Sequence, residues 1–131
     1  MTVAALLAGA ILAGVACFQA ALAIGVPWGY MAYGGQAAFA AGHLPTRLRV
    51  VSAIAVPILV LAAWMVLARA DLVGRGPFPA GFVEVAVWVI GGYLVLNTLA
   101  NLRALTDVER YGLGSLTAIA AIATFVVAIL A

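Results

Sequence analysis

Four long apolar runs decide what this chain can fold into. Each run is long enough to cross the hydrocarbon core of a bilayer, which takes about 20 helical residues. All six arginines lie in the connections or close to the end of a run. Because a lipid-exposed sheet edge would leave backbone groups unpaired, we predict an all-α integral membrane four-helix bundle. The expected spans are residues 3–24, 48–67, 82–102 and 113–130.

The composition agrees with a lipid environment. The 131-residue chain is 68% hydrophobic and 8% charged, whereas a soluble domain has roughly 25% charged residues. We therefore expect one transmembrane domain, residues 1–131, whose main partner is the lipid bilayer. The scattered arginines form no clustered basic face, so the sequence predicts no nucleic-acid partner.

The distribution of the arginines predicts an orientation. The middle connection carries Arg69 and Arg75, and the first and last connections together carry the other four arginines. The positive-inside rule therefore places the first and last connections in the cytoplasm and both termini outside. We expect a multi-pass protein of the bacterial inner (plasma) membrane. Since the excess of arginines on one side is small, dual insertion is the alternative.

The connection between the first two runs contains the stretch GVPWGYMAYGGQ, residues 25–36. Trp28, Tyr30 and Tyr33 have an apolar ring and a polar tip, and such side chains settle at the depth of lipid headgroups. We predict a long interfacial connection that folds back over one end of the bundle. It acts either as an aromatic anchor or as a cap over a ligand, with Gln36 and His43 as polar contacts.

The same stretch, together with LPTRLRVVSA at residues 44–53, is similar to a sequence pattern of a known protein family. It resembles an uncharacterised family of small bacterial four-span membrane proteins, whose pattern is G-x-PWG, then GGQ, then LP with arginines entering the second helix. That family has no assigned activity, so the resemblance implies the architecture and adds no chemistry. Size and span number also resemble the small multidrug resistance exporters. The essential acid of that family lies in the first helix, however, and the first run here has no acid.

The third run is the most polar of the four. At helical spacing, Glu84 and Trp88 fall on one stripe, whereas Tyr93, Asn97 and Asn101 fall on nearly the opposite stripe. A helix that is polar on two sides is expected to touch two neighbours. We therefore place this helix at the centre of the bundle or at an oligomer interface, where Asn97 and Asn101 form interhelical hydrogen bonds.

Catalysis finds little support in the sequence. His43 and the distant Cys17 do not make a metal site, and Ser52 and Ser115 have no recognisable base partner. We therefore expect no enzyme activity, no metal and no cofactor.

The leading functional hypothesis is a non-enzymatic membrane protein that binds a partner subunit or an apolar, lipid-like ligand, with self-association as one form of partner binding. The alternative is a small-solute transporter that works as a homodimer, because the chain has no internal repeat to supply symmetry. The candidate contact residues are Trp28, Tyr30, Tyr33, Gln36, His43, Glu84, Trp88, Asn97 and Asn101.

The orientation can be tested by labelling. Single cysteines that replace Thr2 or Arg75 should react with a membrane-impermeant reagent added outside the cell, whereas a cysteine at Asp107 should not. Equal labelling at all three positions would instead indicate dual insertion.

Overall fold

The computed structural model describes residues 1–33 and 44–131. Its regular elements are all helical, and no described residue lies in a strand. The predicted all-α, four-helix architecture is thereby confirmed. In chain order the elements are α1 (Thr2–Ala23), the 3-10 turn η1 (Gly29–Met31), α2 (Thr46–Arg69), α3 (Ala80–Leu102), the π-helical turn η3 (Val108–Leu113) and α4 (Gly114–Leu130).

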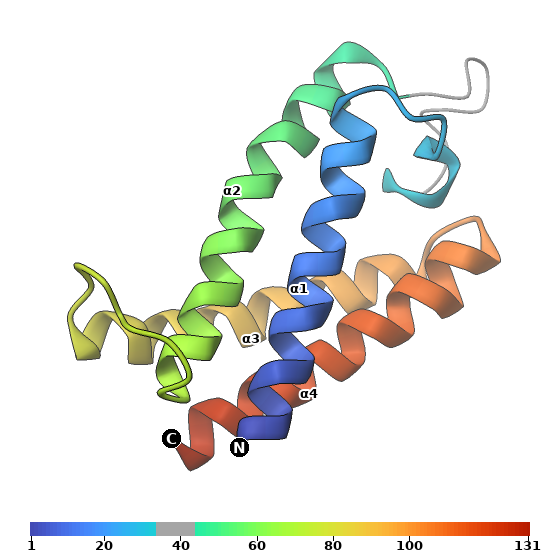
Figure 1. Ribbon diagram of the computed structural model, residues 1–131. Helices are drawn as coiled ribbons and strands as arrows, with labels where there is room; N and C mark the ends of the chain where they lie inside the picture. The colour runs from blue at the N-terminus through green and yellow to red at the C-terminus, as the bar shows by residue number, and fades with distance from the viewer. Residues whose placement is uncertain (34–43) are drawn as a thin grey trace.

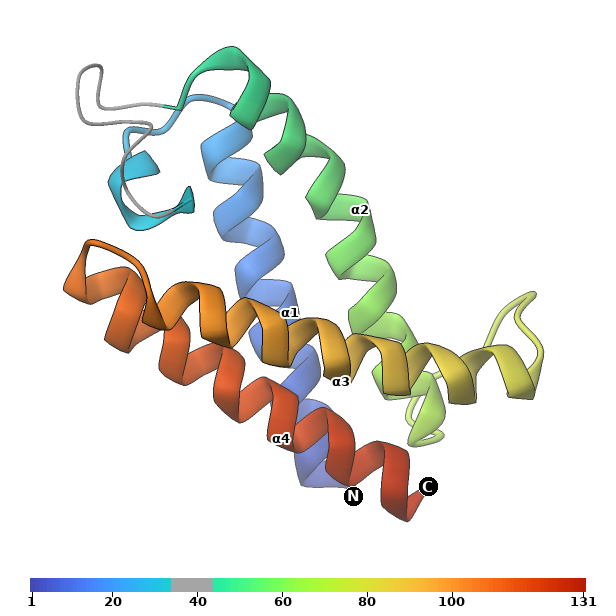
Figure 2. The same cartoon turned by 180° about the vertical axis from the view of Figure 1, so that it is seen from behind.

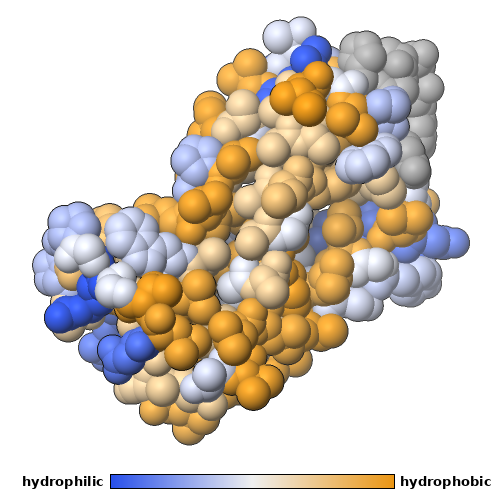
Figure 3. Space-filling model, viewed as in Figure 1, coloured by the Kyte–Doolittle hydropathy of each residue, from blue (hydrophilic) through white to orange (hydrophobic). Residues whose placement is uncertain are grey.

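Four helical segments of the described chain are long and apolar enough to cross a membrane, which makes this a multi-pass membrane protein. Its outer surface agrees, because Val3 is 78% exposed, Leu96 68% and Ile122 67%. Figure 3 shows hydrophobic residues over the middle of the molecule and the most hydrophilic ones near the helix ends. Acyl chains are as apolar as these side chains, so the bilayer solvates them without cost.

The fourth span begins earlier than residue 113. It runs from Val108 to Leu130, because η3 leads directly into α4. Thr106 caps its start, since its Oγ1 accepts a hydrogen bond of 3.3 Å from the backbone N–H of Glu109. The stretch Thr106-Asp-Val-Glu109 fits the S/T-x-x-E capping pattern. The charged residues of this stretch had made it look like part of the connection.

The helices form two antiparallel pairs that cross each other (Figures 1 and 2). The helix α1 packs mainly on α2, and α3 packs mainly on α4. Small buried residues, including Ala5, Ala8, Ala120 and Ala128, join the pairs near the end where both termini lie. Such residues let membrane helices approach closely. At the other end, which carries the first and last connections, the pairs spread apart.

Gly91 lets α3 and α4 come together. A Cβ atom at this position would lie 2.7 Å from Cε1 of Phe125 in α4. The Phe125 ring is also held by Trp88, with ring centroids 5.8 Å apart. A methyl group at Gly91 would therefore have to displace a ring that already has a packing partner.

This close contact gives a matched pair of variants. Gly91→Ala should lower the free energy of unfolding by about 1–3 kcal/mol, the usual cost of overpacking. Gly92→Ala is the control, because a Cβ there meets no heavy atom within 4 Å. Reversible unfolding of both variants in mixed micelles measures the difference. Equal stability of the two variants would show that the α3–α4 contact is looser than described.

Candidate functional site

A cavity of about 340 Å³ lies between the spread ends of the helices. Its volume equals that of roughly eleven water molecules in the liquid and falls at the lower end of the range for ligand pockets, about 300–1,000 Å³. All four long helices contribute to its wall. The described lining residues are Val15, Phe18, Gln19, Ala32, Tyr33, Val51, Ala55, Tyr93, Asn97, Ala100, Asn101, Glu109, Leu113 and Thr117.

The first connection supplies one wall of the cavity. The chain turns away from α1 at Gly25, whose φ of +97° suits a residue without a Cβ. The Trp28 ring stacks on Phe18 of α1 with centroids 6.4 Å apart. The Tyr33 hydroxyl shares a hydrogen bond of 2.8 Å with Oγ of Ser52 in α2. The described part of the connection is therefore held against both α1 and α2 at the spread end of the bundle (Figure 1).

A row of hydrogen-bonded side chains on α3 supplies the opposite wall. Nδ2 of Asn97 donates to the Tyr93 hydroxyl at 3.1 Å, and Nδ2 of Asn101 reaches Oδ1 of Asn97 at 3.4 Å. The Asn101 Nδ2 also lies 3.4 Å from Oγ1 of Thr117 in α4. Thr98 adds a second link to α4 through its hydroxyl, 2.9 Å from that of Thr117. The row therefore ties α3 to α4 and gives the cavity a polar side.

Glu109 brings a carboxyl group to the same cavity. Its side chain is only 5% exposed, although it lies among the charged residues that precede α4. The π-helical geometry of η3 positions it, and turns of this kind occur frequently at functional sites. An ionisable residue buried at the end of a membrane span is by default a candidate functional residue. Sequence reasoning missed Glu109, and the capping pattern described above is the signal that could have found it.

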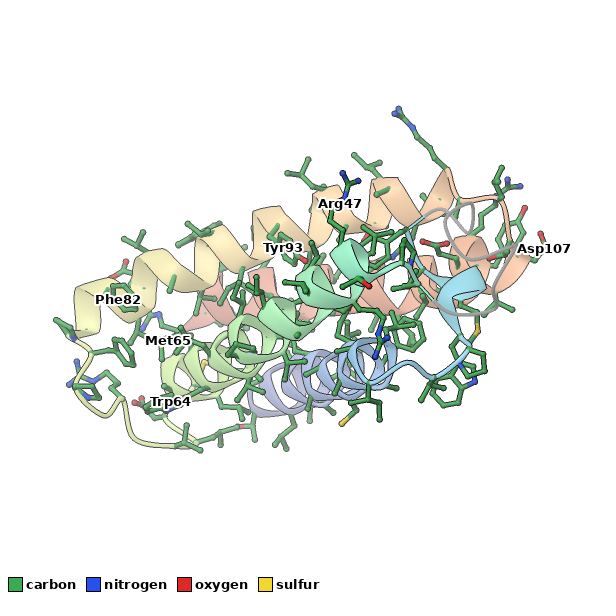
Figure 4. All side chains as sticks on the ribbon, turned by 90° about the horizontal axis from the view of Figure 1, so that it is seen from above. Arg47, Trp64, Met65, Phe82, Tyr93 and Asp107 are labelled. Atoms are coloured by element: carbon green, nitrogen blue, oxygen red, sulfur yellow. The ribbon has the colours of Figure 1, made fainter. Side chains whose placement is uncertain are left out.

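We infer that the cavity opens between α2 and α3, because two of its lining residues, Val51 of α2 and Tyr93 of α3, are 45% and 49% exposed. Figure 4 shows Tyr93 on the side of α3 that faces α2. Because both side chains lie in spans, a molecule dissolved in the bilayer has lateral access to the cavity.

The structure brings some of the predicted contact residues together. Tyr33, Asn97 and Asn101 line the cavity, and Trp28 lies behind Phe18 in its wall. Gln19, which the sequence suggested only as an interhelical hydrogen-bonding residue, also lines it.

The remaining predicted residues lie elsewhere. Glu84 is exposed, and Trp88 is 46% exposed and packs on Phe125, so neither lines the cavity. Gln36, His43 and the side chain of Tyr30 lie outside the described residues.

A second hollow lies between the other ends of α2 and α3. It has a volume of about 320 Å³ and is lined by apolar side chains, among them Met65 and Phe82 (Figure 4). It offers no polar group to orient a ligand, so the polar cavity is the better candidate site.

Within the described residues, no three His, Cys, Asp or Glu side chains lie close enough together to hold a metal ion. The fold and the spans define an all-helical, multi-pass membrane protein. Comparison with protein-family models, with curated proteins and with solved structures finds no match for the chain.

Proposed function

We propose that this protein binds a small amphiphilic molecule in the cavity between the spread helix ends, as a non-enzymatic protein of the bacterial inner membrane. The observation that carries the proposal is the two-sided wall of the cavity. Val15, Phe18 and Val51 offer apolar surface, whereas Gln19 and Asn101 offer polar groups. A ligand with an apolar body and a polar head matches both sides at once.

The position of the cavity supports the same proposal. It lies at the end of the spans that carries the first and last connections, so a polar head placed there is close to the headgroup region. The opening between α2 and α3 lets the apolar body extend into the bilayer. A fully apolar ligand would leave the buried side-chain oxygen of Gln19 without a polar partner, which is costly in a buried site.

Two other functions have weaker support. Transport with Glu84 as the coupling residue requires that its carboxylate face the bundle, and Glu84 is exposed on α3. Nucleophilic catalysis by a serine or cysteine has no candidate among the described lining residues, which include neither. Ser52 lies nearby, but its hydroxyl is paired with that of Tyr33.

The proposal predicts that an amphiphile co-purifies with the protein. A matched pair of variants then distinguishes binding in the cavity from lipid binding at the outer surface. Val51 lines the cavity, whereas its neighbour Val50 is similarly exposed, at 52%, and does not line it. Val51→Phe fills part of the cavity and should lower the amount of bound amphiphile about tenfold or more, the result of losing roughly 1.4 kcal/mol of affinity. Val50→Phe should leave that amount unchanged.

The bound molecules are identified by native mass spectrometry after mild extraction from the native membrane. If the wild-type protein reproducibly carries no small molecule, the proposed function is wrong. Equal loss in both variants would place the ligand on the outer surface instead.

A further inference from the structure

Two polar residues of the cavity wall, Asn101 and Thr117, already use their hydrogen-bond donors within the protein. Both Nδ2 groups of the row, on Asn97 and Asn101, donate to neighbouring side chains. The Thr117 hydroxyl is within 3.0 Å of the Leu113 carbonyl oxygen, to which it can donate. An amide offers donors only through its nitrogen, and a hydroxyl has one proton to give. Asn101 and Thr117 therefore have no donor left for a ligand, whereas Asn97 keeps one N–H and Tyr93 keeps its hydroxyl proton.

Acceptor oxygens of the cavity wall also remain available to a ligand. The Gln19 Oε1 is buried and has no hydrogen-bond partner. The Asn101 Oδ1 receives no hydrogen bond from any described residue, although the residue is only 8% exposed. A buried polar atom without a partner costs free energy comparable to a lost hydrogen bond. Both residues line one cavity, so a ligand that donates hydrogen bonds there would remove this cost at Gln19.

The charges around the cavity favour the same kind of ligand. Glu109 is the one acidic residue among the described lining residues, and none of those residues is basic. No arginine is among the described lining residues, and two of those near this end of the bundle are directed at backbone carbonyls: Arg49 donates to Ala23 and Arg110 to Ala104. An anionic head would meet a carboxyl group and carbonyl oxygens without a described basic side chain in the wall.

We infer that the head group of the ligand is a protonated primary amine, carried on an apolar body. This inference rests on the proposed function and names the chemistry of its ligand. A primary ammonium has three N–H donors and no acceptor, which complements the oxygens of Gln19 and Asn101 in a wall that also holds an acidic residue, Glu109. A quaternary ammonium has the same charge but no N–H donor. The ethanolamine head of a phospholipid and a free long-chain amine both provide the required group.

The test compares three probes with the same tail. Radiolabelled decylammonium, decyltrimethylammonium and decyl sulfate are titrated onto the protein in phosphatidylcholine nanodiscs, with empty nanodiscs as background. Specific binding is the part that Val51→Phe abolishes and Val50→Phe retains. Decylammonium should bind about tenfold or more tightly than either other probe, since only its head group can donate hydrogen bonds to the acceptors of the wall.

A variant of Gln19 ties this preference to the site. Gln19→Leu has a similar size but no acceptor, so the preference for decylammonium over decyltrimethylammonium should shrink by about tenfold. Gln19→Glu retains an oxygen acceptor and should retain the preference. If Gln19→Leu does not fold, the comparison of the three probes on the wild-type protein still decides the question.

The outcomes separate the head-group inference from the proposed function. The amine assignment would be overturned by equal affinity for all three probes or by a preference for decyl sulfate. If Val51→Phe still abolishes the binding in that case, amphiphile binding in the cavity remains in place. No specific binding of any probe would overturn the amine assignment. If, in addition, nothing co-purifies with the protein, the proposed function falls as well. If decylammonium is preferred, phosphatidylethanolamine is added to the nanodiscs as a competitor. Competition identifies a phospholipid as the source of the amine head group, whereas no competition identifies a free long-chain amine.

Discussion

The bilayer offers no hydrogen bonds to the groups inside it, and the structure depends on how the protein meets this constraint. Helices pair their own backbone groups but leave the last carbonyls of each helix without an intrahelical donor. Arginines provide part of the solution. Arg49 donates to the Ala23 carbonyl at the end of α1, and Arg69 donates to the Ala131 carbonyl just beyond α4. A cation at the C-terminal end of a helix also interacts favourably with the helix dipole. Two of the arginines that suggested the topology thus also pair with backbone carbonyls at helix ends.

The same constraint explains why the polar side chains of the spans are paired. Thr124 directs its hydroxyl to the Ala120 carbonyl within α4, and Tyr33 and Ser52 share a hydrogen bond across two elements. Against this background the buried oxygen of Gln19 is an exception. It lies at the end of the bundle where the helix pairs spread, and the small residues that close the other end are replaced there by Phe18, Tyr33 and Tyr93. Larger side chains at the spread end hold the helices apart and leave the cavity between them.

Much of the fold could be predicted from the sequence, because four apolar runs bounded by arginines leave few alternatives. The start of the fourth span could not be read in the same way, since the pattern beginning at Thr106 and ending at Glu109 serves both as a polar connection and as a helix cap. Which side of α3 is buried against the other helices was equally hard to infer. In a soluble helix, polar residues mark the outer face. In a membrane helix both faces are apolar, so the exposed Glu84 and the buried Asn101 look alike in sequence. Only the packing of α3 on α4 separates them.

The candidate site could be predicted only in part, because it is assembled from residues of every long helix. Asn97 and Asn101 were recognisable as unusual residues for a span, but Thr117, the partner of Asn101 on α4, follows from the α3–α4 contact alone. The position of Gln19 opposite this row depends on how the two helix pairs cross, which no local pattern encodes.

The most direct measurement is an experimental density map of the protein crystallised with its native lipids. The account predicts non-protein density in the cavity, with an atom of the ligand within hydrogen-bonding distance of Gln19 Oε1 or Asn101 Oδ1 and an apolar part leading out between α2 and α3. A map in which α1 and α3 close on each other, so that these two oxygens are paired within the protein and no cavity remains, would contradict it.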